Sequence, residues 1–438
     1  MFRNAALAFS LVTALVPLHA EVKVLKNFTL FDGTGKPPMA SAAMIVNDGR
    51  IQWVGPVASL KAPAGAETID LTGRFVMPGI INLHGHVGNV VGLTQDPKFF
   101  TRQNIEKDLR TYASYGVTTV LSLGTDQDLI FKIRDEQRAT GRPTETRIYS
   151  AGQGFTAKGA YGGLPGVTYF LTNVNEIPKD VADQAAKHVD IIKLWCDDHM
   201  HHLKKLPFEY SKAIIDSARQ HHLHVAAHIF YLSDAKQLTN AGVYGLAHSV
   251  RDQPVDQALI DSMKSHGTWQ MAATLARELS MFVYAKPAPF LNDPFFTRSI
   301  SPDVVAKLKS PQYEKQIASD EDFPRYAPIL KTAQQNLKRL VDAGVKYGFG
   351  TDAGPPGRFP GVFEQLELQL EVEAGLTPRQ AILGATRNAA EFLGASKDLG
   401  TLQTGRWADL IVLKQNPLTN IKNTRTIETV WIAGRKVN

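Results

Sequence analysis

The chain has almost no cysteine, since Cys196 is the only one among its 438 residues. An intrachain disulfide is therefore excluded, and a chain of this length can rely on a large hydrophobic core instead. The chain also lacks runs of Lys or Arg, and its net charge of +6 comes from scattered residues. Because nucleic-acid binding requires a basic patch or stripe, we expect no nucleic-acid partner.

Long hydrophobic runs are absent after the first 20 residues, so no later segment is long enough to span a membrane. The first 20 residues differ from the rest. Arg3 supplies a positive charge, residues 5–17 are apolar, and Ala20 is a small residue before Glu21. This pattern predicts a secretory signal peptide over residues 1–20, cleaved after Ala20. We expect a secreted or periplasmic protein with no membrane segment; an uncleaved N-terminal anchor is the alternative.

Short strands separated by turn residues occur at both ends of the chain. Near the start, Val22–Leu25 and Ala43–Val46 are examples, and near the end Leu410–Leu413 and Thr429–Ile432 have the same character. Each piece is too small to bury a sheet face alone. We therefore predict one small β-sandwich domain that residues 21–76 and 400–438 build together.

Strands and helices alternate over residues 77–399, which predicts an α/β fold. Eight such units favour a (β/α)8 TIM barrel, and a doubly wound open sheet is the alternative. One connection, residues 279–325, is unusually long and follows the seventh strand, so it forms either a wall of the substrate pocket or a peripheral insertion. The expected strands are Ile80–His84, Val117–Leu123, Arg147–Ala151, Ile191–Leu194, Val225–His228, Gly245–His248, Trp269–Ala272 and Tyr347–Thr351.

Polar residues stand at the ends of five of these strands, where active sites of such barrels lie. Taken singly, each has an ordinary explanation: a strand-end His is often a hydrogen-bonded core residue, and a buried Lys is usually paired. Two His one residue apart point the same way along a strand, and neutral imidazole is a common metal ligand. Together they indicate a metal site. The residues are His84, His86, Lys193, His228, His248 and Asp352.

The motifs that contain these residues resemble the metal-dependent amidohydrolase superfamily, and more narrowly its imidazolonepropionase-like and prolidase-like members. The resemblance covers nearly all of the chain after residue 20. Its motifs are Val76–His86, Ile191–Leu194, Ala227–His228, Ala247–His248, Gly348–Gly354 and the C-terminal Gly400–Leu402 with Gly405–Leu410.

The resemblance implies two divalent metal ions, for which Zn suits the His-rich ligand set best. His84, His86 and Asp352 would hold the inner ion, and His228 and His248 the outer one. Lys193, carboxylated on its nitrogen, would bridge the two. A hydroxide between the metals would be the nucleophile, and Asp352 would act as the catalytic residue that accepts its proton and returns it to the leaving amine.

The deaminase branch of the superfamily has a Glu three residues after the strand-five His, and this chain has Tyr231 there. The difference favours a two-metal hydrolase, and Tyr231 is a candidate substrate contact or else a packing residue. The segment Asp197–His202 has two interpretations. It contacts the substrate or a third ion, or it is a solvated polar loop.

The predicted function is hydrolysis of amide (C–N) bonds in small or dipeptide-like substrates. Hydrolysis of a lactone or phosphoester at the same two-metal site is the alternative enzyme function. A non-catalytic binding protein with a structural metal is the alternative outside enzymes. The expected partner is a small-molecule substrate, and formation of a homo-oligomer is left open.

Overall fold

The computed structural model of the chain describes residues 21–437. The predicted signal peptide, residues 1–20, lies outside the described residues. Within the described part, none of the helices combines the length and the apolar character that crossing a membrane requires.

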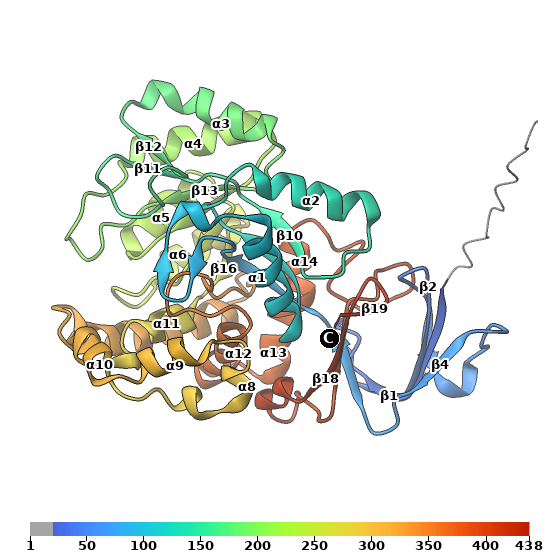
Figure 1. Cartoon of the computed structure of the whole chain (residues 1–438). Coiled ribbons are helices and arrows are strands. Elements are labelled where there is room, and N and C mark those ends of the chain that lie inside the picture. The colour runs from blue at the N-terminus through green and yellow to red at the C-terminus, as the bar shows by residue number, and fades with distance from the viewer. Residues whose placement is uncertain (1–20, 438) are drawn as a thin grey trace, which may run out of the picture.

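Strands from both ends of the chain form one eight-stranded sheet, in the order β19-β18-β17-β5-β1-β2-β3 with β4 paired to β1. Figure 1 shows the early and late strands side by side. The predicted contribution of both chain ends is present as this single sheet; packing of the sheet into a sandwich stays a prediction. The strands are β1 Val22–Leu30, β2 Met39–Asn47, β3 Arg50–Pro56, β4 Glu67–Asp70, β5 Phe75–Pro78, β17 Leu410–Leu413, β18 Ile427–Ile432 and β19 Arg435–Lys436.

The end sheet leads directly into the second part of the fold, because β5 and the first strand of the α/β part are separated only by Gly79. A Cβ atom at Gly79 would lie 2.2 Å from Thr118 Oγ1, so only glycine fits this close passage. Beyond it, parallel strands alternate with helices, as predicted. These strands are β6 Ile80–Gly85, β9 Val117–Ser122, β10 Arg147–Ser150, β13 Ile192–Trp195, β14 Val225–His228, β15 Gly245–Ala247 and β16 Trp269–Ala272.

These strands are arranged as in a TIM-barrel-like fold. They pair in parallel as β10-β9-β6 and as β13-β14-β15-β16. The eighth predicted strand, Tyr347–Thr351, is not a regular strand. Its backbone lies between the edge strands of the two sheets: Gln270 of β16 bridges to Tyr347, and the Leu83 amide of β6 donates to the Phe349 carbonyl at 2.8 Å.

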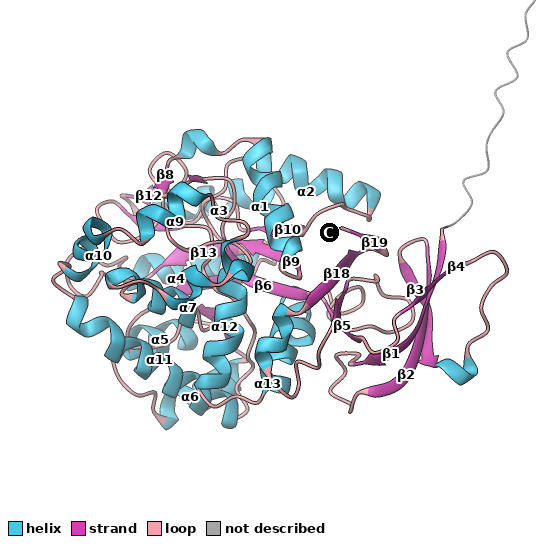
Figure 2. Cartoon of the chain, turned by 60° about the horizontal axis from the view of Figure 1, so that its bottom comes forward, coloured by secondary structure: helices cyan, strands magenta, loops and turns pink. Residues whose placement is uncertain are grey.

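Helices, most of them amphipathic, cover the outside of these strands, and Figure 2 shows the helices on one side of the molecule with the end sheet on the other. Their buried faces carry apolar side chains that join one extensive core with the strands. The helices are α1 Arg102–Ser114, α2 Leu129–Thr140, α3 Ile177–Ala186, α4 Phe208–Gln220, α5 Leu232–Asn240, α6 Gln257–His266, α11 Phe323–Asp342, α12 Val362–Glu373, α13 Pro378–Leu383 and α14 Ala389–Phe392.

The long connection after β16 is largely helical. It contains α7 Leu275–Ser280, α8 Pro294–Thr297, α9 Pro302–Leu308 and α10 Pro311–Ala318, three of which start with proline at the first position. Its start and the beginning of α11 form an apolar cluster with two other loops, in which Met281 and Tyr326 pack with Met200 and Phe230. This contact supports the interpretation of the segment as a pocket wall.

Candidate metal centre

Three predicted ligands form a compact buried cluster at the carboxyl ends of the strands. One ligand atom from each of His84, His86 and Asp352 lies within 4.8 Å of the others. Asp352 Oδ1 lies 3.0 Å from His86 Nε2 and 3.6 Å from His84 Nε2. Two imidazoles and a carboxylate at this spacing are a ligand set that a divalent metal ion accepts.

The other two predicted histidines adjoin this cluster. The ring of His248 lies 4.8 Å from the ring of His84 and 4.1 Å from that of His228, measured between centroids. Burial lowers the pKa of His228 to about 4 and that of His248 well below its ordinary value, so both rings are neutral at neutral pH. A neutral ring is the form that binds a metal.

Lys193 is fully buried and lies close enough to His84, His228 and Asp352 for their charges to interact. Burial lowers the pKa of its amine to about 7, with Asp352 opposing the shift and Arg277 adding to it. A buried amine that is partly neutral at pH 7 is a nucleophile rather than a fixed cation. This state is the one that reaction with CO₂ requires.

Hydrogen bonds orient three of the histidine rings. Thr125 Oγ1 lies 2.8 Å from His86 Nδ1, Asp197 Oδ2 lies 2.8 Å from His228 Nε2, and Thr274 Oγ1 lies 2.6 Å from His248 Nδ1. Each ring therefore keeps one nitrogen free for a metal, and the partner fixes which one.

The unpaired polar atoms test whether metal ions fit this site. Among the described residues, His248 Nε2 and Lys193 Nζ are buried and have no hydrogen-bond partner. Unpaired buried nitrogen atoms are costly, and two among the predicted ligands call for a missing partner. A divalent metal ion beside His248 and a carboxylated Lys193 would satisfy both. The residues present therefore fit the metal centre that the sequence predicts.

The two oxygen atoms of the Asp352 carboxylate face different groups of neighbours. While Oδ1 faces the histidines, Oδ2 accepts a hydrogen bond from Arg358 and lies 3.8 Å from Arg277 Nε. Burial alone would raise the pKa of Asp352, but the cation of Arg358 and the ring of His84 hold it well below its ordinary value. Asp352 is therefore ionised and ready to bind a metal.

Several site residues have a left-handed backbone that non-glycine residues rarely adopt. The φ angle is 70° at His248, 56° at Thr274 and 57° at Asp352. Backbone strain of this kind is concentrated at functional sites, where the surrounding structure must hold it.

Tyr231 lies at the edge of the site. Its hydroxyl donates to Asp198 Oδ1 at 2.7 Å, and its ring stacks on His201. It also lines a groove of about 460 Å³ together with Arg251 and Phe230. Its role as a substrate contact stays a prediction. The loop that begins at Asp197 is only partly solvated, because Asp197 and Asp198 are buried while His201 and His202 are exposed.

Five residues that hold or face the predicted ligands are not among the predicted site residues. Asp197 is predicted only as part of a loop, although it follows β13 by two residues. Thr125 and Thr274 also stand just beyond strand ends, so the same rule that identified the ligands could have found them. Arg277 and Arg358 lie farther along their connections and give no such signal.

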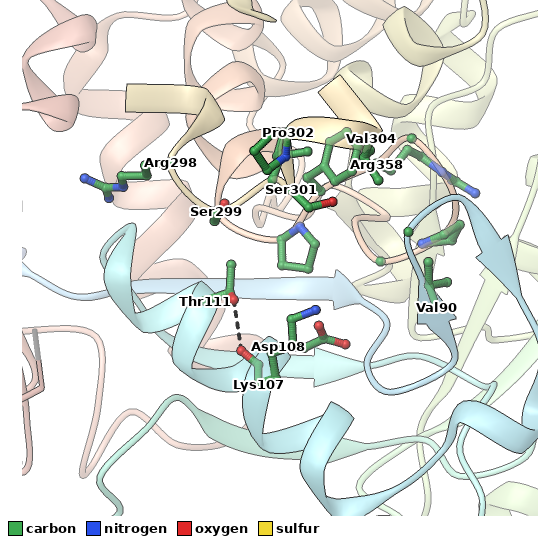
Figure 3. Close-up of a pocket in the computed structure, with 17 residues that line it drawn as sticks. Val90, Lys107, Asp108, Thr111, Arg298, Ser299, Ser301, Pro302, Val304 and Arg358 are labelled. Carbon is green, nitrogen blue, oxygen red and sulfur yellow. Dashed lines mark hydrogen bonds between the residues drawn. The ribbon is translucent and has the colours of Figure 1, made fainter. Parts of the chain in front are cut away.

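A pocket of about 400 Å³ is lined in part by the turn that follows Asp352, which includes Gly354 and Arg358 (Figure 3). Asp108 of α1 and Ser301 line it from opposite sides, and Arg358 forms part of its wall. Arg358 is thus shared between this pocket and the carboxylate of Asp352.

The fold and the cluster together define a class of protein: a TIM-barrel-like enzyme with histidines and a carboxylate for metal at the carboxyl ends of its strands. The chain belongs to the amidohydrolase family, whose sequence profile matches residues 75–437. It is therefore a hydrolase of carbon–nitrogen bonds, in a family that is generally metal-dependent.

Similar proteins agree with this assignment along nearly the whole chain. Ochratoxinase of Aspergillus niger is 24% identical over 95% of this chain and 87% of its own length. Imidazolonepropionase of Deinococcus deserti is 26% identical over 90% of this chain and 92% of its own. The predicted place in the imidazolonepropionase-like and prolidase-like branch is confirmed.

Solved structures share the fold. A Xaa-Pro dipeptidase structure with bound methionine superimposes with a TM-score of 0.74 at 19% identity, covering 95% of this chain and 99% of that one. The structure of A. niger ochratoxinase gives a TM-score of 0.70 at 22% identity, covering 95% of both chains.

Proposed function

We propose that the protein hydrolyses amide bonds of small or dipeptide-like substrates with two divalent metal ions, for which Zn suits the ligands best. The observation that carries the proposal is the buried cluster of His84, His86 and Asp352 beside His228 and His248. The names of the similar proteins support amide substrates, since they include a Xaa-Pro dipeptidase.

Each residue has a role in holding the ions. His84, His86 and Asp352 would hold the inner ion, and His228 with His248 would hold the outer one. Lys193, once carboxylated, would serve both ions, because a carbamate is an anion with two oxygen atoms and replaces an unpaired buried amine. When bound, the two ions lower the pKa of a water molecule and polarise the substrate carbonyl.

Asp352 is the residue that moves the proton. Its Oδ1 lies on the histidine side of the carboxylate and is the atom that receives a proton from the attacking water. Its low pKa then favours transfer of this proton to the leaving amine, which is far more basic than the carboxylate. Arg358 holds Oδ2, which keeps Oδ1 directed at the site.

A substrate panel tests the proposal. The purified protein is analysed for metal and then offered N-blocked dipeptides, lactones and phosphotriesters under the same conditions. We expect about two divalent ions per chain and turnover of the dipeptides. Exclusive turnover of the lactones or phosphotriesters would contradict amide hydrolysis and favour the alternative reaction. A protein that binds no divalent metal would overturn the proposed mechanism.

We also propose a domain organisation and a location for this enzyme. The bridges through Tyr347 and Phe349 close the strands into a barrel over residues 77–399, and residues 21–76 and 400–438 form the accompanying β domain. Export with cleavage after Ala20 places the enzyme in the periplasm or outside the cell. The intact mass of the protein recovered from an expressing host tests the cleavage, since the mature chain should begin at Glu21.

A further inference from the structure

Helix α12 carries three carboxyl groups that are completely buried, and the proposed mechanism uses none of them. Glu364, Glu367 and Glu371 each have 0% exposure. Spacings of three and four residues place them along one side of the helix. Buried carboxyl groups are rare because they lose their hydration, so each requires a reason to be there.

Glu364 is connected to the inner half of the metal centre. Its Oε1 accepts hydrogen bonds from Asn82 Nδ2 at 2.5 Å and from Thr351 Oγ1 at 2.7 Å. Asn82 Oδ1 in turn accepts from the backbone amide of His84 at 2.8 Å. Thr351 Oγ1 accepts from the amide of Ala353 at 3.1 Å. One carboxyl group therefore fixes the backbone on which His84 stands and both neighbours of Asp352.

Glu367 is connected to the outer half. Its two oxygens accept from the backbone amides of Leu275 at 2.9 Å and Ala276 at 2.6 Å, which start α7. The residue before them is Thr274, whose hydroxyl lies 2.6 Å from His248 Nδ1. Thr274 has a left-handed backbone, so the start of α7 needs an anchor to hold it. Glu367 supplies that anchor.

Glu371 provides a comparison on the same helix. Among the described residues, neither of its carboxyl oxygens has a hydrogen-bond partner, and the side chain of Tyr347 is a polar neighbour. It is as deeply buried as the other two but has no connection to a predicted ligand.

We propose that Glu364 and Glu367 are positioning residues, which separately set the two halves of the metal centre: Glu364 the His84–Asp352 half and Glu367 the His248 half. The inference rests on the proposed metal centre and adds that two residues of one helix position different halves of it. Neither residue touches a metal or substrate; each acts through the hydrogen-bonded atoms named above.

Zinc titration of the metal-free protein tests this division. In a His248→Ala background the titration reports the inner half, and in a His86→Ala background it reports the outer half. We expect Glu364→Gln to weaken zinc binding about tenfold or more in the first background and to leave the second nearly unchanged. Glu367→Gln should show the reverse pattern. Glu371→Gln, the matched control, should change neither.

The selectivity is the decisive result, because a general loss of packing would weaken both halves together. Equal losses in both backgrounds, or losses no larger than those of Glu371→Gln, would overturn the inference while leaving the proposed function intact. Wild-type protein that binds no zinc would overturn both.

A second pair of variants covers the case in which a buried Gln prevents folding. Asn82→Ala breaks the link from Glu364 to His84, and Thr274→Val breaks the link from α7 to His248. These variants should reproduce the inner and outer losses respectively, with the helix unchanged. If they weaken the opposite halves or neither, the inference is wrong.

Discussion

Three of the four histidines in the candidate metal centre are oriented by single hydrogen bonds, and the one between Asp197 and His228 is the most informative. Burial would raise the pKa of Asp197, but the bond to His228 and the cations of Arg251 and Arg277 lower it below its ordinary value. An ionised Asp197 fixes the proton on His228 Nε2 and leaves Nδ1 free for the outer ion that we propose.

We therefore expect Asp197→Asn to weaken binding of the outer ion about tenfold or more, because the ring loses its charged partner. Competition of the metal-loaded protein with a chelator measures this loss. Asp198→Asn is the matched control, since Asp198 bonds Tyr231 and His201 rather than a predicted ligand. Identical metal loss from both variants would assign Asp197 a role in the loop alone.

Lys193 gives a prediction about pH. Its amine, with a pKa of about 7, is neutral and able to react with CO₂ above that pH and protonated below it. We expect carboxylation of Lys193 to increase between pH 6 and pH 8. The ¹³C NMR signal of protein treated with labelled bicarbonate measures it.

Lys193→Ala should abolish that signal and most of the activity, and a short carboxylic acid should restore part of the activity by occupying the place of the carbamate. A labelled signal of equal size in Lys193→Ala would show that another residue is modified.

At the scale of elements, the predicted ligands could be found because they stand at strand ends. Residues that act from loops and helices could not be predicted in this way. Every predicted ligand stands within two residues of a parallel strand or of the extended segment after Tyr347, where period-two patterns fix direction. Arg358 reaches Asp352 from a turn, and Glu364 acts from a helix whose sequence pattern shows only burial. Such contacts depend on how loops and helices pack, which local periodicity does not encode.

The buried position of Glu364 on α12 gives a prediction about stability. Burial raises its pKa from 4.5 to about 7. The folded chain therefore keeps a proton that the unfolded chain loses between these values, so wild-type stability falls as pH rises through this window. Glu364→Gln has no such proton.

Relative to Glu364→Gln, the free energy of unfolding of the wild type should fall by about 3 kcal/mol between pH 4.5 and pH 7. Urea denaturation of both metal-free proteins at the two pH values measures this difference. A difference that stays constant with pH would mean that Glu364 keeps its ordinary pKa.

At the scale of the whole molecule, the sequence predicted that both chain ends share a β domain but not how they pair. In the structure β17 pairs antiparallel with β5, which matches Leu410 with Pro78 and Leu413 with Phe75. The short end strands have similar apolar patterns, so their order and register depend on tertiary contacts that no single segment specifies. The chain itself continues from β5 of the end sheet through Gly79 into β6, the first strand of the α/β part.

One ion pair also connects the α/β part to the end sheet. Arg147 of β10 donates to Asp409 through Nε at 2.8 Å and Nη2 at 3.3 Å, and Asp409 also accepts from the Ala433 amide at 2.6 Å. Both side chains are largely buried, with 12% and 5% exposed. Removing only the arginine would leave a buried carboxylate without its cation, which is strongly destabilising.

We expect Arg147→Met to lower the free energy of unfolding by about 3 kcal/mol, and Arg147→Met combined with Asp409→Asn to recover part of the loss, because the uncompensated charge is gone. Thermal and urea unfolding followed by circular dichroism measure both. If the junction makes the two parts one cooperative unit, the wild type unfolds in a single transition and Arg147→Met broadens or splits it. A loss below about 0.5 kcal/mol would mean that this ion pair contributes little to holding the end sheet to the α/β part.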